Sequence, residues 1–349
     1  MGDSCIYCNY INRRPKCRKG SNQMKCWTAG LTAAILAAAL LLGGCTEAPA
    51  GSDGGSSEKT TSTAKTTTTA TVSAIDVSGG FFSRLRETRS ELLARNSGNT
   101  VTITNQVVEL SYDNGKSKRR LPDKWAKRVI DNSKDMDFGF FISSNKTAFI
   151  CVDDSRLIVA YSDDQGLTWQ DSVINAAIDD ADTAEYDLPS NSLDADQVSY
   201  GFLDFPTANC GYLVLGYGTN MNRNLKFVIK TADGGKTWDY VSCVGRDSPQ
   251  SGLMFINDSV GFMTKTSLVA SAGSVCKTMD GGATWSEFTL DFSGEFPYAD
   301  WRSSILSPYF QGEKGYLPIY VYNSSSDAGR IIYYVSDDEG KTWVYNLSE

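Results

Sequence analysis

The pattern of apolar and polar positions divides the chain into four parts. Residues 27–42 are almost wholly apolar, whereas residues 45–80 are rich in Thr, Ser, Gly and Ala and offer almost nothing to bury. Residues 81–99 carry apolar side chains at helical spacing, which predicts a short helix. In residues 100–349, short runs of β-branched and aromatic residues predict strands and an all-β domain.

Strands are predicted most clearly in the second half of this domain. The runs lie at residues 210–216, 225–230, 240–243, 260–263, 275–277, 315–320 and 330–335. A Gly followed by Tyr or Phe recurs at one place in the pattern, at residues 211–212, 261–262 and 315–316. Such a recurrence indicates that the domain is built from repeated units.

One short motif recurs with these strands. It reads Ser/Thr-x-Asp-x-Gly-x-Thr-Trp and occurs at residues 162–169, 231–238, 278–285 and 336–343. A degraded copy without the Trp occupies residues 111–117, and the first positions of the five copies are 51, 69, 47 and 58 residues apart. This spacing is typical of β-propeller blades and predicts about five of them. Only a short strand region, residues 100–110, precedes the degraded copy, so the first blade is either incomplete or closed by strands from elsewhere.

Each residue type of the motif has a structural explanation. Asp accepts hydrogen bonds from the backbone of a tight turn, Gly takes a positive φ, and Trp begins the next strand and buries its ring. The motif therefore predicts a hairpin between the last two strands of a blade, and we expect no catalytic role for its members. They are Ser162, Asp164, Gly166, Trp169, Thr231, Asp233, Gly235, Trp238, Thr278, Asp280, Gly282, Trp285, Ser336, Asp338, Gly340 and Trp343.

These repeats resemble the Asp box, or BNR repeat, of sialidases, sortilin-type receptors and the photosystem II assembly factor family. The resemblance covers residues 100–349 and implies a β-propeller. The Gly-Tyr and Gly-Phe pairs are similar to a strand position of the assembly factor family. In propellers of this kind the boxes lie on one face, and substrates bind the other face around the central channel. Because Asp boxes occur in proteins of different activity, the resemblance implies a fold more than a function.

Residues 1–44 have the layout of an export signal. A basic residue precedes an apolar run that is short for a transmembrane helix, and small residues follow it. Residues 42–45, Leu-Gly-Gly-Cys, resemble the lipobox of bacterial lipoproteins, which implies a lipid on Cys45 and a disordered tether over residues 45–80. We therefore expect a domain anchored to the bacterial cell membrane and facing outside the cytoplasm. An uncleaved anchor is the alternative, and translation starting at Met24 is a second option for the N-terminus.

Composition removes several kinds of chemistry. The chain has 349 residues, a net charge of −8 and no histidine. The absence of histidine removes Ser-His-Asp and Cys-His catalysis and most zinc sites, and the acidic balance argues against a nucleic-acid partner. Acids at residues 179–199 lack the spacing of an EF-hand, so we predict a solvated loop and no metal or cofactor. Buried free thiols are favoured over disulfides for the cysteines of the domain, which are Cys151, Cys210, Cys243 and Cys276.

Candidate chemistry is confined to loops on the face opposite the boxes. One loop brings together Glu295, Tyr298, Asp300 and Arg302, which are residue types that a sialidase uses beside three converging arginines. The Arg-Ile-Pro motif of sialidases is absent, and those enzymes normally have six blades. We therefore expect a non-catalytic module that binds or assembles an envelope protein or glycan, with these four as candidate binding residues. The alternative is a sialidase-like exo-glycoside hydrolase.

The lipobox generates a prediction about processing. Cleavage before Cys45 should leave a diacylated N-terminal cysteine, because its sulfur is the atom that carries the lipid. Mass spectrometry of the membrane fraction checks this, with a Cys45→Ala variant as control because it has no sulfur to modify. A soluble product that starts before Cys45 would contradict the prediction.

Overall fold

The computed structural model describes the chain from residue 81 to residue 346, with gaps. The described ranges are 81–104, 107–135, 137–218, 225–245, 250–267, 272–291, 301–323 and 329–346. The predicted signal peptide, the tether with Cys45, and the candidate residues Glu295, Tyr298 and Asp300 lie outside them.

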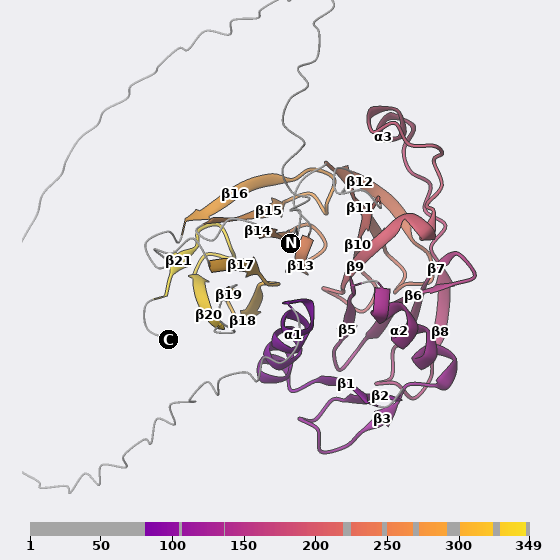
Figure 1. Ribbon diagram of the computed structural model, residues 1–349, viewed down its shortest axis with the longest axis horizontal. Coiled ribbons are helices and arrows are strands. Elements are labelled where there is room, and N and C mark those ends of the chain that lie inside the picture. The colour runs from indigo at the N-terminus through magenta and orange to yellow at the C-terminus, as the bar shows by residue number, and fades with distance from the viewer. Residues whose placement is uncertain are drawn as a thin grey trace, which may run out of the picture. The chain divides into compact units, whose positions relative to one another are not determined.

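The strands form five blades around a centre (Figure 1). Blade 1 contains β1 (Thr100–Thr104), β2 (Val107–Ser111) and β3 (Arg119–Arg120). Blade 2 contains β5 (Phe140–Ile142), β6 (Thr147–Asp153), β7 (Arg156–Ser162) and β8 (Gln170–Val173). Blade 3 contains β9 (Val198–Asp204), β10 (Gly211–Tyr217), β11 (Leu225–Thr231) and β12 (Asp239–Val244), with β4 (Asp137–Phe138) parallel to β9.

The last two blades share one continuous sheet. Blade 4 contains β13 (Gln250–Phe255), β14 (Gly261–Ser267), β15 (Ala272–Thr278) and β16 (Ser286–Asp291). Blade 5 contains β17 (Trp301–Ile305), β18 (Tyr309–Gln311), β19 (Lys314–Asn323), β20 (Gly329–Ser336) and β21 (Val344–Tyr345). The end of β14 pairs with β17, which joins the two blades. The prediction of an all-β propeller of about five Asp-box blades is confirmed.

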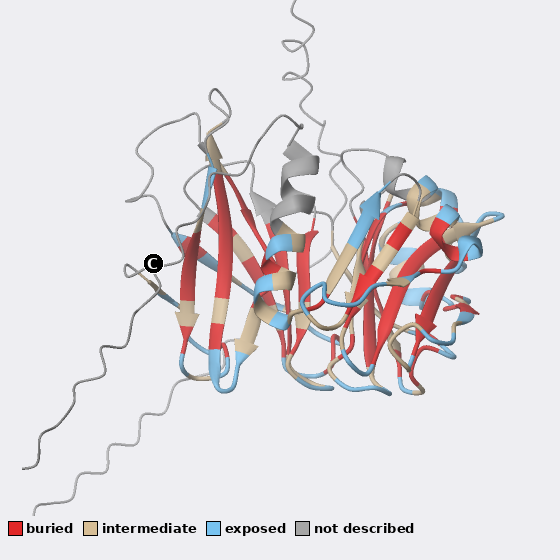
Figure 2. Cartoon of the chain, turned by 90° about the horizontal axis from the view of Figure 1, so that it is seen from below, coloured by how far each residue is buried: buried red, intermediate tan, exposed pale blue. Residues whose placement is uncertain are grey.

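The middle strands are buried on both faces, because each blade packs between two others. Every residue of β10 is buried, and Figure 2 shows buried residues running along the strands with exposed ones at their ends. Strands of this kind are continuous apolar runs rather than alternating ones. This explains why runs such as residues 210–216 stand out in the sequence.

In the ranges given above, three α-helices and the short 3-10 helix η1 (Ala195–Gln197) accompany the blades. α1 (Phe81–Ser97) lies within residues 81–99, where the sequence predicts a short helix. α3 (Asp180–Glu185) lies in the acidic loop between blades 2 and 3. α2 (Asp123–Asp135) follows blade 1 and packs its Trp125 ring into the core, 4 % exposed. No helix in the ranges given above is long and apolar enough to cross a membrane.

An aromatic cluster explains the Gly-Tyr and Gly-Phe pairs. In blade 3, Phe205 lies over Gly211 and meets the box Trp238 edge-on, with 6.1 Å between ring centroids. A Cβ atom on Gly211 would come within 2.4 Å of the Phe205 ring, so a larger residue does not fit. The same cluster recurs as Phe255, Gly261 and Trp285, and as Phe310, Gly315 and Trp343.

The aromatic residue after the first two of these glycines reaches the next blade. Tyr212 of blade 3 stacks on Phe255 of blade 4 with 3.5 Å between ring centroids, and Phe262 of blade 4 lies 6.4 Å from Phe310 of blade 5. The core is therefore continuous from one blade to the next.

Candidate functional site

In each box turn, polar side chains form hydrogen bonds with the backbone of the same turn. Asp164 accepts hydrogen bonds from the Thr168 hydroxyl at 2.6 Å and from the Thr168 N–H at 2.8 Å. Ser162 Oγ accepts the N–H of Gly166 at 2.8 Å, and the φ of Gly166 is 80°. The bonds from Thr168 lower the pKa of Asp164 to about 2. Equivalent bonds occur at Asp233, Asp280, Asp338 and, in the degraded copy, Asp113.

The backbone carbonyl groups of the same turns accept hydrogen bonds from side chains of the preceding blade. Ser172 Oγ in blade 2 donates to Gly235 O in blade 3 at 2.5 Å. Lys146 of blade 2 is 2 % exposed and donates its Nζ to Gly234 O at 2.7 Å. We call each such contact between two blades a joint. At the other joints the side chains of Arg119, Ser242 and Lys277 donate to the backbone carbonyls of Gln165, Gly282 and Gly340, respectively. These carboxylates, hydroxyls and carbonyls of the boxes are thus used within the protein, both in the turn and between blades.

A carboxyl group lies between the inner strands of blades 3 and 4. Asp204 Oδ2, at the end of β9, accepts the N–H of Phe255, at the end of β13. Burial raises the pKa of Asp204 to about 7, and the bonds from the backbone of Phe255 and Phe205 offset only part of that effect. Sequence analysis did not single out Asp204, because a single acid at the end of a strand resembles an ordinary surface residue.

Helix α1 lies against the inner strands of three blades. Arg89 donates through Nη2 to the carbonyl of Ser251 in blade 4 at 2.7 Å. Its guanidinium lies 5.0 Å from the centroid of the Phe202 ring in blade 3, a cation–π contact. Leu92 is 7 % exposed and packs in a cluster with Leu306 of blade 5. The helix therefore occupies the centre of the ring (Figure 1). The sequence predicted a helix here but not this position.

A cavity of about 670 Å³ lies beside α1. Most of its wall is apolar and comes from Leu93 of α1, Val129 of α2, and strands of the blades, among them Phe140 of β5, Phe149 of β6 and Leu253 of β13. Its volume is within the range of pockets that bind ligands. Both helices and strands of the blades shape it.

The candidate top-face residues do not come together as a described site. Arg302 is half-buried in β17, and its three companions lie among the residues that are not described. The arginines that a sialidase site would require are spread over three blades, as Arg119 and Arg120, Arg156, and Arg302 and Arg330. Arg120 pairs with Asp123 at 2.9 Å, and Arg156 with Asp153 at 3.7 Å.

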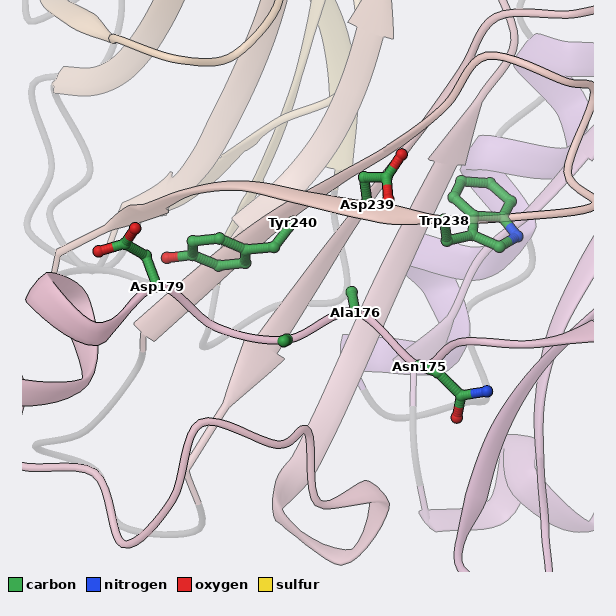
Figure 3. Close-up of a pocket in the computed structure, with 7 residues that line it drawn as sticks. Asn175, Ala176, Asp179, Trp238, Asp239 and Tyr240 are labelled. Carbon is green, nitrogen blue, oxygen red and sulfur yellow. The ribbon is translucent and has the colours of Figure 1, made fainter.

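A second pocket, of about 440 Å³, lies on the rim between the acidic loop and β12 (Figure 3). Tyr240 points toward Asp179 there and donates its hydroxyl to Asp182 of α3. Burial, followed by the bond to Asp182, raises the pKa of Tyr240 far above its usual value. Asp179 caps α3 by accepting the N–H of Ala181 at 2.7 Å. Asp182 therefore holds the loop to blade 3, and Asp179 fixes the start of its helix.

The thiols in the domain are unsuited to nucleophilic chemistry. Cys151, Cys210 and Cys243 are free thiols, and burial raises the pKa of both Cys151 and Cys243 to about 12. The thiolate is the reactive form, so these groups stay unreactive at neutral pH.

Comparison with known families matches the same repeat. Residues 160–171, which contain the first full box, match the family model of the BNR/Asp-box repeat. The other full boxes lie in the corresponding hairpins of the ring. The chain is an Asp-box β-propeller. No curated protein matches it.

Solved structures that resemble this Asp-box propeller have low sequence identity. The NanB sialidase from Streptococcus pneumoniae is 14% identical with a TM-score of 0.36, and the match covers 64% of this chain and 34% of that chain. A GH74 xyloglucanase from Xanthomonas campestris is 15% identical with a TM-score of 0.38, covering 72% of this chain and 36% of that chain. A Hadza microbial sialidase is 16% identical with a TM-score of 0.38, covering 71% and 55%. The propeller spans about a third of the length of the first two.

The position of Asp204 generates a prediction about pH. The folded-state pKa of about 7 exceeds the ordinary value of 3.8, so the folded state binds the extra proton between these values. Stability from this group is therefore present at pH 4 and is lost as the pH rises through 7. Asp204→Asn keeps an acceptor for Phe255 without a charge. Measured by urea unfolding at pH 8, the free energy of unfolding of the variant should exceed that of the wild type by up to about 4 kcal/mol.

The difference should nearly vanish in the same experiment at pH 3, below the ordinary value of 3.8, where Asp204 is protonated in the folded and the unfolded state alike. Because both proteins contain the same other titrating groups, the contributions of those groups cancel when the two free energies of unfolding are subtracted. A difference that is equal at both pH values would contradict the prediction.

Proposed function

We propose that this Asp-box propeller is a non-catalytic binding module, held by a lipid on Cys45 at the outer side of a bacterial membrane, where it binds or helps assemble an envelope protein or glycan. The position of α1 carries the proposal. Arg89 and Leu92 fix the helix against the inner strands of blades 3, 4 and 5. In the sialidase-like alternative, a substrate would bind around the ring centre, part of which this helix occupies.

The chemistry of the described side chains also favours binding over catalysis. Glycoside hydrolysis requires one group that donates a proton near neutral pH and a second that attacks or activates water. The box carboxylates hold turns, and a pKa of about 2, as at Asp164, makes a group a poor proton donor. Arg119 and Arg120 are engaged at separate contacts, with Gln165 O and Asp123, rather than in a shared carboxylate clamp.

The architecture suits recognition. Five blades joined through their turns form a rigid support, and the segments between strands project from it. Binding residues are commonly found on loops that a rigid scaffold positions. A lipid on Cys45 would place such a scaffold where envelope components are within reach.

Turnover of a fluorogenic sialoside by the full-length protein tests the proposal. We expect no hydrolysis above the buffer rate, because the described arginines form no shared carboxylate clamp. An established sialidase in the same buffer is the positive control, and circular dichroism verifies that the propeller is folded. Robust hydrolysis that Tyr298→Phe abolishes would overturn the binding proposal in favour of the glycosidase.

A further inference from the structure

Blade 1 lacks the inner strand that the other blades have. The inner positions of blades 2 to 5 are held by β5, β9, β13 and β17. Blade 1 begins with β1, which pairs with β2 and with no other strand in the described part of the chain. The segment before β1 is α1, where a repeat would have its first strand. Figure 1 shows β1 as the strand of its blade nearest to the ring centre, beside α1.

The pairing register identifies the backbone groups on this free edge. Leu121 donates its N–H to the carbonyl of Val108 at 2.9 Å, so the backbone groups of Val108 point toward β3. Ile103 lies opposite Val108, and this is therefore a pair without hydrogen bonds between the two strands. The N–H and C=O of Ile103 then point away from β2. The same parity holds for Val101, which lies opposite Leu110.

The free edge borders the cavity beside α1. Val101, Thr102 and Ile103 line the cavity, and apolar side chains of α2 and of the inner strands line it as well. Ile103 is 49 % exposed, which is unusual for so large an apolar side chain. An unpaired strand edge beside exposed apolar surface is a template for the addition of another strand.

We propose that β1 is a docking site for an extended peptide segment of the partner protein, which adds to blade 1 as its missing inner strand. This inference rests on the proposed role as a binding module, and it names a polypeptide as the ligand. Main-chain hydrogen bonds to Val101 and Ile103 give the affinity. Apolar side chains at alternate positions of the peptide pack on the cavity wall.

The geometry of the edge favours a polypeptide over a glycan or a free apolar molecule. The groups of Val101 and Ile103 recur after two residues, or about 7 Å, which is the repeat of an extended chain. β1 spans five residues, about 17 Å, and matches a segment of similar length. In blade 4, β13 lies antiparallel to β14 in the place that is vacant in blade 1.

The added strand would also continue an interface that the ring already has. Val101 packs on the apolar cluster between blades 1 and 2, which contains Val108 and Phe149. A peptide on the free edge extends this cluster toward the ring centre, where Phe149 and Leu253 line the cavity.

Fluorescence anisotropy with a labelled octapeptide tests the proposal on the full-length protein. The probe alternates Thr and Val between terminal lysines. A control probe has N-methylvaline in place of each Val, which keeps the charges and the side chains but removes the N–H groups that would face Val101 and Ile103. We expect the first probe to bind and the control probe to fail.

A matched pair of variants locates the site. Ile103→Pro removes one N–H from the free edge and leaves the bonds to β2, whereas Ile103→Thr keeps that N–H and a β-branched side chain. Pro is tolerated where the strand N–H has no partner, so both variants should melt near the wild-type temperature. We expect about tenfold weaker binding for Ile103→Pro than for Ile103→Thr. Hydrogen exchange over residues 100–104 should slow when the probe binds to Ile103→Thr.

Three results would overturn the proposal. Equal binding of both probes would mean adsorption by side chains or charge alone. Equal binding to the two variants would place the peptide elsewhere. Binding that appears only after residues 46–80 are removed would mean that the chain's own segment holds the edge. None of these results involves sialoside turnover, so the docking site can fail while the proposed non-catalytic function stands.

Discussion

The hydrogen bond from one blade to a carbonyl in the box turn of the next is the contact on which the ring depends. Asp233 fixes the backbone of Thr237 within its turn, and the carbonyl of Gly235 in that turn accepts the hydroxyl of Ser172 from blade 2. The indole N–H of Trp238 reaches the same serine at 3.1 Å. One set of residues therefore closes a hairpin and joins two blades, and each part of this network supports the others.

Blades 5 and 1 share no joint of this kind among the described residues, and α1 connects them. Leu92 packs in the cluster of blade 5, and the carbonyl of Gly98, just after the helix, accepts the N–H of Asn114 in blade 1 at 2.8 Å. The helix thus takes over the role of an inner strand in holding the ring together, but it cannot pair with the edge of β1. The helix at the ring centre and the free edge of β1 therefore have the same origin.

Much of the fold was predictable because the box specifies a hairpin through residues with few substitutes, such as Gly166 at positive φ. The helix α2 escaped prediction, although Trp125 and Val129 after Pro122 have helical spacing that could have revealed it. The contacts of Arg89 and Asp204 could not be predicted from the sequence. Their partners lie 162 and 51 residues away, so their roles exist only once the blades have assembled.

We infer that a box stabilises the joint with the preceding blade as well as its own turn. Hydrogen exchange of Asp233→Ala tests this directly, with Asp239→Ala as the control because Asp239 is exposed beside the same box. We expect faster exchange both in the turn at residues 231–238 and in β8 of blade 2, with β20 of blade 5 unchanged. A change confined to residues 231–238, with β8 as protected as in the control, would contradict it.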